Sequence, residues 1–148
     1  MRSARIHTLQ TVQRVRQRLR DSAASEAGIA AARARDADAN GARAARDEDA
    51  LLSDASTRFA VTDRPTDLLG FEHARRIAGN NTKAAIEAAA QARAKEAQTL
   101  DLLQQRARTL ATVDAAIDRL QHARTERHNK DEQAAQDDLA AGRAARKI

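Results

Sequence analysis

Histidines and acidic clusters are the residues of this sequence whose chemistry could hold a metal ion. His122 and His128 stand six positions apart and do not share a helical face, unlike the i, i+4 pair of a helical zinc site. His7 and His122 could approach each other only across two paired helices, and two histidines supply too few ligands for zinc. The acidic clusters at 47–49 and 131–138 would spread around a helix axis instead of converging on a cation. We therefore expect no metal site.

Nucleophilic and nucleotide chemistry is equally unsupported. None of the five serines has a neighbouring histidine or the glycines of a nucleophile elbow, and no glycine-rich phosphate-binding motif occurs. The chain has no cysteine, which excludes disulfides and thiolate ligands. The sequence predicts that the protein is not an enzyme, with no catalytic residue, no cofactor-binding residue and no cofactor.

Arginine is the residue type whose placement points to a partner. Six arginines precede the first acidic residue, Asp21, and the whole chain carries a net charge of +5. These early arginines are Arg2, Arg5, Arg14, Arg16, Arg18 and Arg20. Such a basic pole favours an acidic protein cavity, a nucleic acid or an anionic membrane.

The elements that carry these residues are expected to be long helices. Charged residues make up 32% of the chain and aromatic residues 1%, while alanine supplies most of the apolar fraction. An alanine- and arginine-rich chain with helical periodicity is typical of coiled coils. Disorder is the alternative, but strong helix formers dominate and only Pro65 and five glycines interrupt them.

Two apolar stripes can be aligned as antiparallel partners. One passes through Leu9, Val12, Val15, Leu19 and Ala23 and continues mainly on alanine to Phe59. The other begins at Phe71 and passes through Leu100, Leu103 and Leu110 to Leu120. Partners whose residue numbers add to 129 or 130 are Leu9 and Leu120, Val12 and Ile117, Leu19 and Leu110, Ala30 and Leu100, Ala37 and Ala92, and Phe59 and Phe71.

A constant sum is the property of two antiparallel helices, because each step away from the turn moves both partners equally. We therefore predict an all-α protein, a long antiparallel two-helix coiled-coil hairpin with a protruding C-terminal helix. The whole chain, 1–148, forms a single coiled-coil domain in this prediction. Its first helix spans about 6–61, its turn 62–67 and its second helix about 68–146.

Two local signals refine these bounds. Pro65 biases Arg64 away from the α region, and Thr66 or Asp67 can cap the second helix. The three poor helix formers at 79–81, Gly-Asn-Asn, mark a possible break, which would be either a kink or the end of a short helix.

The length, the two-helix pattern and two motifs resemble the FliJ family of flagellar export-apparatus stalk proteins and their counterparts in type III secretion injectisomes. The first motif follows the turn and contains an aromatic residue, Phe71-Glu72-His73-Ala74-Arg75-Arg76-Ile77. The second is the charged stretch Glu126-Arg127-His128-Asn129-Lys130-Asp131-Glu132, followed by alanines and closing arginines. The likeness covers nearly the whole chain.

The resemblance implies a central stalk that enters a hexameric export ATPase and links it to the membrane export gate. The candidates for binding the ATPase ring are arginines at both ends of the chain: Arg14, Arg16, Arg18, Arg20, Arg124, Arg127, Arg143 and Arg146. The candidates for binding the cytoplasmic domain of the export gate are Phe71, Ala74, Ile77 and Ala78. Export chaperones are a further class of partner, and the sequence separates neither flagellar from injectisome members nor rotating from static stalks.

Localisation follows from the same reading. The chain has no apolar run of transmembrane length and no apolar segment of a signal peptide, which favours a cytosolic protein. The resemblance to the stalk family implies a place in the bacterial cytoplasm, peripheral to the inner membrane at the export apparatus. The arginine-rich start also resembles a transit peptide or an amphipathic membrane helix. The alternative function is a basic coiled-coil protein that associates with nucleic acid or acts as a structural scaffold, although no stacking aromatics or basic-region motif accompany the charge.

Overall fold

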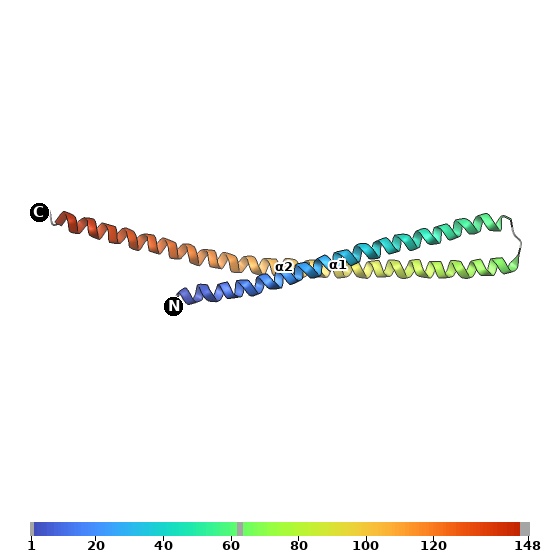
Figure 1. Cartoon of the computed structure of the whole chain (residues 1–148), viewed down its shortest axis with the longest axis horizontal. Helices are drawn as coiled ribbons and strands as arrows, with labels where there is room; N and C mark the ends of the chain where they lie inside the picture. The colour runs from blue at the N-terminus through green and yellow to red at the C-terminus, as the bar shows by residue number, and fades with distance from the viewer. Residues whose placement is uncertain (1, 62–63, 146–148) are drawn as a thin grey trace. The chain divides into compact units, whose positions relative to one another are not determined.

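The computed structural model describes the backbone of residues 2–61 and 64–145 and the side chains of residues 5–61 and 64–142. It contains two long helices, α1 (Arg2–Phe59) and α2 (Pro65–Ala145), and the described part of the chain has no β-strand (Figure 1). The two helices pack against each other, which confirms the all-α class. Among the described residues, neither helix contains an apolar stretch long enough to cross a membrane.

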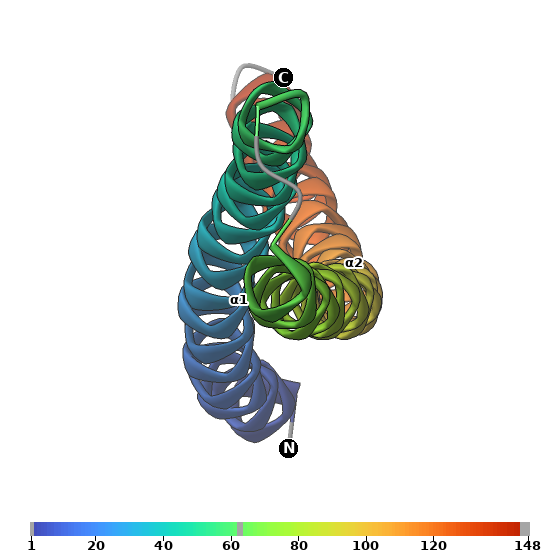
Figure 2. The ribbon, with the colours of Figure 1, turned by 90° about the vertical axis from the view of Figure 1, so that its right-hand side faces the viewer.

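Contacts divide the chain into two units, each built from part of both helices. Unit 1 comprises Met1–Asp21 and Gln105–Ile148. Unit 2 comprises Ser22–Gln104 and includes the point where α1 ends and α2 begins, which faces the viewer in Figure 2. Each unit thus has its own stretch of contact between the helices.

The second helix begins three residues earlier than predicted, at Pro65 instead of Leu68. The carbonyl of Arg64 accepts hydrogen bonds from the backbone N–H groups of Asp67 (3.1 Å) and Leu68 (3.4 Å), so Arg64 takes the capping position expected of Thr66 or Asp67. Proline is favourable as the first helical residue because it has no N–H group to leave unpaired. Residues 62 and 63 of the predicted turn lie outside the described residues.

The second helix does not end at 79–81, because α2 continues through Gly79, Asn80 and Asn81. One glycine costs a helix about 1 kcal/mol relative to alanine, and packing against a partner readily outweighs such a cost. Contact with α1 is close here, since the Thr82 hydroxyl donates to the carbonyl of Ala44 across the helices at 3.2 Å. Tertiary contact therefore holds together a segment whose own propensity is poor.

In unit 2, small side chains form the contact between the helices. The buried residues contributed to this contact are mostly alanine: Ala23, Ala30, Ala34, Ala55 and Ala89. Gly41 is also buried, and a Cβ added there would lie 3.8 Å from the carbonyl oxygen of Ala85. Small residues on both helices permit this close approach of the backbones.

Two side-chain contacts between the helices complete unit 2. Asp38 and Arg93 form a two-pronged ion pair, with nitrogen–oxygen distances of 2.8 and 3.2 Å. Phe59 and Phe71 meet edge to face with ring centroids 4.9 Å apart, the partners that the sequence predicts.

In unit 1, α2 contributes the larger buried side chains, Leu110, Val113 and Ile117. The opposing residues of α1 differ from the prediction. Gln13, Arg16 and Arg20 are half-buried, and the Gln13 amide donates to Asp114 at 2.7 Å. Val15 and Leu19, predicted in the stripe, are 53% and 41% exposed.

The reason for this difference is the order of the helical steps. From Leu9, strictly alternating steps of four and three lead through Gln13, Arg16 and Arg20 to Ala23. The apolar path takes two steps of three and then two of four, so it drifts away from a partner that a coiled coil keeps at a period of 3.5. The coiled-coil period thus prevails over hydrophobicity here.

The same rule corrects one position of α2 in unit 2. Leu100, predicted to pack against Ala30, is 48% exposed, whereas the neighbouring Thr99 is buried. The Thr99 hydroxyl donates to the carbonyl of Glu96 at 2.9 Å, which satisfies its polar group inside the contact. Alternating steps of four and three from Ala92 lead through Glu96 to Thr99 and bypass Leu100.

Every residue from 124 to 142 of α2 is exposed. Ala123 is half-buried and is the last described residue of α2 that is not exposed. The two pairs His122–Glu126 and His128–Glu132, with nitrogen–oxygen distances of 3.4 and 3.1 Å, lie along the same helix. We name residues 124–142 the tail.

Candidate functional site

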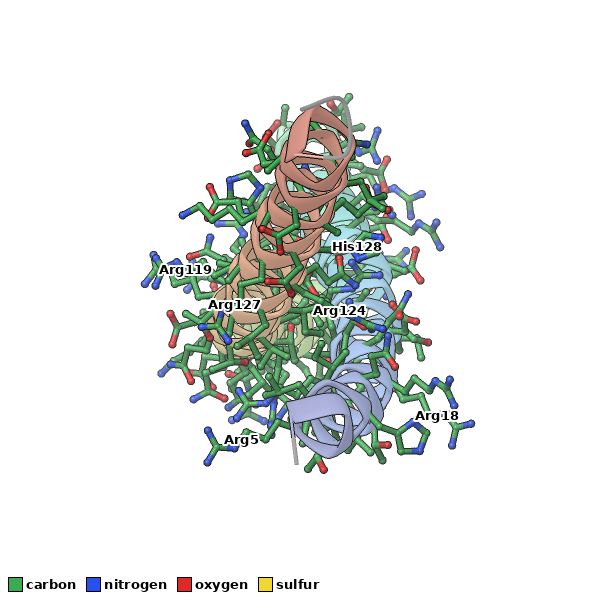
Figure 3. The ribbon with its side chains drawn as sticks, turned by 90° about the vertical axis from the view of Figure 1, so that its left-hand side faces the viewer. Arg5, Arg18, Arg119, Arg124, Arg127 and His128 are labelled. Carbon is green, nitrogen blue, oxygen red and sulfur yellow. The ribbon has the colours of Figure 1, made fainter. Side chains whose placement is uncertain are left out.

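Arginine side chains on unit 1 are the first candidate interaction surface. Arg5 and Arg18 extend from α1, and Arg119, Arg124 and Arg127 extend from α2 (Figure 3). Arg18 and Arg119 point to opposite sides of the unit, so the positive charge surrounds it instead of gathering on one face. Within the side chains that the structure describes, these five arginines form no ion pair.

The predicted ring-binding arginines separate into two groups. Arg14, Arg18, Arg124 and Arg127 are exposed. Arg16 and Arg20 are half-buried: Arg16 donates to the carbonyl of Thr109 at 3.4 Å, and Arg20 pairs with Asp21 at 2.7 Å. Part of the surface of Arg16 and Arg20 is therefore already in contact with other residues of unit 1.

Two further predicted ring-binding residues lie at the C-terminal end. The side chain of Arg143 and the whole of Arg146 lie outside the described residues.

A groove in unit 1 accompanies the displaced apolar residues of α1. Its volume is about 480 Å³, and its apolar lining comes from Val12, Val15 and Leu19. Arg16 and Arg106 supply its charge, and none of its lining residues is acidic. The groove is the direct result of the coiled-coil period, which points Val15 and Leu19 away from the seam, meaning the positions that face the other helix, and leaves Val12 half-buried.

Unit 2 holds the predicted gate-binding residues. Phe71, Ala74 and Ala78 are half-buried, and the ring of Phe71 packs against the ring of Phe59. Ile77 is exposed. Of the four, Ile77 therefore offers the most apolar surface to a partner.

Three exposed apolar residues beside the helix ends were missed by the sequence analysis. Val61 is 85% exposed, Leu69 is 73% exposed, and Leu68 is also exposed. Val61 borders a cavity of about 770 Å³ that Phe59 and Phe71 also line. A signal was present in the sequence, since Leu68 and Leu69 are adjacent leucines that cannot both face one helix, and they precede the apolar stripe.

A polar cavity of about 600 Å³ lies on the same unit and is lined by Glu48, Glu72, His73, Arg76 and other residues. In the part of the chain that the structure describes, no three histidine, aspartate or glutamate side chains stand close enough to hold a metal ion. Glu72 instead pairs with Arg75 at 3.6 Å along the helix.

Comparisons with known proteins add no relative to this picture. No family model matches the chain, and no curated protein and no solved structure is significantly similar to it.

Proposed function

We propose that this protein is the central stalk of a flagellar or related type III protein export apparatus. In this proposal unit 1 enters the pore of the hexameric export ATPase, and the helix ends of unit 2 contact the cytoplasmic domain of the membrane export gate. The protein itself performs no catalysis and needs no cofactor. It works in the cytoplasm, peripheral to the inner membrane, and export chaperones are additional partners.

The proposal includes the antiparallel coiled-coil hairpin with a protruding C-terminal helix. Contacts within each unit support opposite helix directions. In unit 2, contacts pair Asp38 with Arg93, Ala44 with Thr82 and Phe59 with Phe71, so residue numbers rise on α1 as they fall on α2. In unit 1, Gln13 contacts Asp114 and Arg16 contacts Thr109, again in descending order.

The observation that carries the proposal is the exposed, unpaired positive charge around a section only two helices thick. An exposed arginine without an ion pair contributes its full field to the surroundings and attracts an acidic surface. Because Arg18 and Arg119 point to opposite sides, a ring that encloses unit 1 meets positive charge in more than one direction. A two-helix section has no six-fold symmetry, so it must contact six identical subunits unequally and favour different states in them.

The exposed apolar side chains near the helix ends support the second contact. Val61, Leu68, Leu69 and Ile77 are exposed apolar residues of unit 2, so each has apolar surface left to bury against a partner. We add Val61, Leu68 and Leu69 to Ile77 as candidates for the export gate. Phe71 packs against Phe59, and both rings line the same cavity as Val61.

The decisive test is ATP hydrolysis by the purified export ATPase of the same bacterium, measured at physiological salt with and without this protein. The wild-type chain is expected to raise hexamer formation and turnover. The variant Arg14→Glu/Arg18→Glu/Arg124→Glu/Arg127→Glu should lose this effect while retaining its helix content, because all four side chains are exposed.

The matched control is Arg35→Glu/Arg43→Glu, which reverses two exposed arginines of α1 in unit 2 and should stimulate like the wild type. Unchanged ATPase activity together with tight, sequence-specific binding of a DNA duplex would replace the stalk with the nucleic-acid-associated alternative. Weak, salt-sensitive DNA binding would not distinguish the two functions, because any basic surface shows it.

A further inference from the structure

We infer that the apolar groove of unit 1 binds the acidic segment 131–142 in the tail of a second copy of this chain, so that the isolated protein forms a tail-exchanged dimer. This inference is independent of the proposed function. It concerns two features of unit 1 that lack a partner within the described residues, the groove and the tail.

The groove has the properties of a helix-binding site. Val12, Val15 and Leu19 follow one another on α1 at steps of three and four, which is the spacing that receives a helix. Val15 and Leu19 remain about half exposed, so apolar surface is left to bury. The Arg16 guanidinium has one long bond, 3.4 Å to Thr109, and can turn toward an incoming carboxylate.

The complementary chemistry is confined to the last part of the tail, because residues 124–130 include Arg124, Arg127 and Lys130. Residues 131–142 contain no basic residue and four acidic ones: Asp131, Glu132, Asp137 and Asp138. Ala135 and Leu139 stand at i and i+4 and share one face of α2, and Asp131 and Asp138 lie close to that face. The segment 131–142 thus offers an apolar strip edged by carboxylates to a groove edged by arginines.

Binding of the tail in the groove is expected to be energetically favourable. An isolated helix of about 20 residues is marginal in water, so a tail without contacts is favoured when it finds a surface. The groove cannot be filled by the tail of its own chain, because the tail continues the same unbroken helix, α2, that lines the groove through Arg106 and Thr109. The tail of a second copy is free of this constraint, because it is not part of the helix that lines the groove.

The test uses the purified full-length chain in sedimentation equilibrium. We expect reversible dimerisation that weakens at least about tenfold when salt is raised from low to high concentration, because charge pairs at the groove edge are screened. The groove variant Arg16→Glu/Arg106→Glu and the tail variant Asp131→Arg/Asp138→Arg should each be monomeric. Arg119→Glu, at an exposed arginine that does not line the groove, is the matched control and should dimerise normally.

Mixing the two variants provides the sharpest outcome. The acidic segment 131–142 of the groove variant fits the basic groove of the tail variant, and the charge-reversed segment fits the charge-reversed groove, so the mixture should form a heterodimer. If the groove variant loses helix content, the tail variant alone still decides the point, since its changes lie at exposed positions. A wild-type chain that stays monomeric, a tail variant that dimerises normally, or a mixture of two folded variants that stays monomeric would each overturn the inference.

Discussion

Units 1 and 2 bring the same two helices together by opposite means. Unit 1 buries large side chains, Leu110, Val113 and Ile117, but mainly on α2, and opposes them partly with polar residues. Unit 2 buries alanines from both helices and adds directional contacts such as Asp38–Arg93. The comparison shows that two helices can pair through large buried side chains or through small residues that let the backbones come close. Substitutions should therefore affect the stability of the two units differently.

The largest effect is expected from removing bulk in unit 1. Ile117→Ala should lower the free energy of unfolding by about 3 kcal/mol, because it removes buried apolar atoms and leaves a cavity. Chemical denaturation followed by circular dichroism measures this change. Ile86→Ala, at a 57% exposed position of α2, is the control and should shift the free energy of unfolding by less than about 0.5 kcal/mol. Equal effects at the two positions would show that Ile117 is not a core residue.

The aromatic pair of unit 2 is expected to contribute next. Phe71→Ala should cost about 2 kcal/mol, less than a fully buried aromatic residue, because Phe71 is half-buried against Phe59. Phe59→Ala should cost a similar amount, and the double variant should cost less than the two single changes together. Additive losses would mean that the two rings stabilise the protein separately.

A substitution at an exposed residue tests the proposed gate surface separately from the core. Leu69→Asp, at a 73% exposed position, should leave the melting temperature nearly unchanged and abolish binding to the export gate domain. Retained binding by a folded Leu69→Asp variant would remove this residue from the gate surface.

Adding bulk to unit 2 should also destabilise, by about 1.5 kcal/mol, although it increases hydrophobicity. Ala34→Leu places three more carbons where alanine is 2% exposed and the helices are in close contact. Ala32→Leu, on an exposed position of the same helix, should be nearly neutral in a melting experiment. Stabilisation by Ala34→Leu would show that the helices of unit 2 are free to move apart.

The smallest effect is expected from the ion pair. Asp38→Asn should cost about 0.5 kcal/mol at low salt, and high salt should reduce the difference from the wild type, because both side chains are partly exposed to solvent. Glu72→Gln removes a longer pair with Arg75 on the surface of one helix and should have no measurable cost. A loss above about 2 kcal/mol for Asp38→Asn would place this pair among the main stabilising contacts of unit 2.

Much of the fold was predictable from the sequence because helix propensity and periodicity are local. The two helices and the contact of Phe59 with Phe71 followed from spacing alone. The error at Val15 and Leu19 arose because hydrophobicity and the coiled-coil period disagree there, and only packing decides between them. The continuity of α2 through 79–81 has the same origin, since contact with α1 is a tertiary effect.

The candidate surfaces were predictable only in part. Charge can be counted in a sequence, so the basic character of unit 1 was evident, but the partial burial of Arg16 and Arg20 depends on helix rotation. The exposure of Val61, Leu68 and Leu69 depends on where α1 ends and α2 begins, which was predicted three residues late for α2. Surface properties therefore followed helix ends and rotation, which sequence patterns define least well.

The alanine contact of unit 2 also has a consequence for register. Alanine or glycine recurs at steps of three and four from Ala23 to Ala44, so sliding α1 along α2 by one heptad replaces small residues with other small residues. Apolar packing alone would hold several such alignments at similar free energy. The Asp38–Arg93 pair and the Thr82–Ala44 bond exist in only one of them. Contacts that add little to stability can thus help the Phe59–Phe71 contact to select a single alignment of the helices in unit 2.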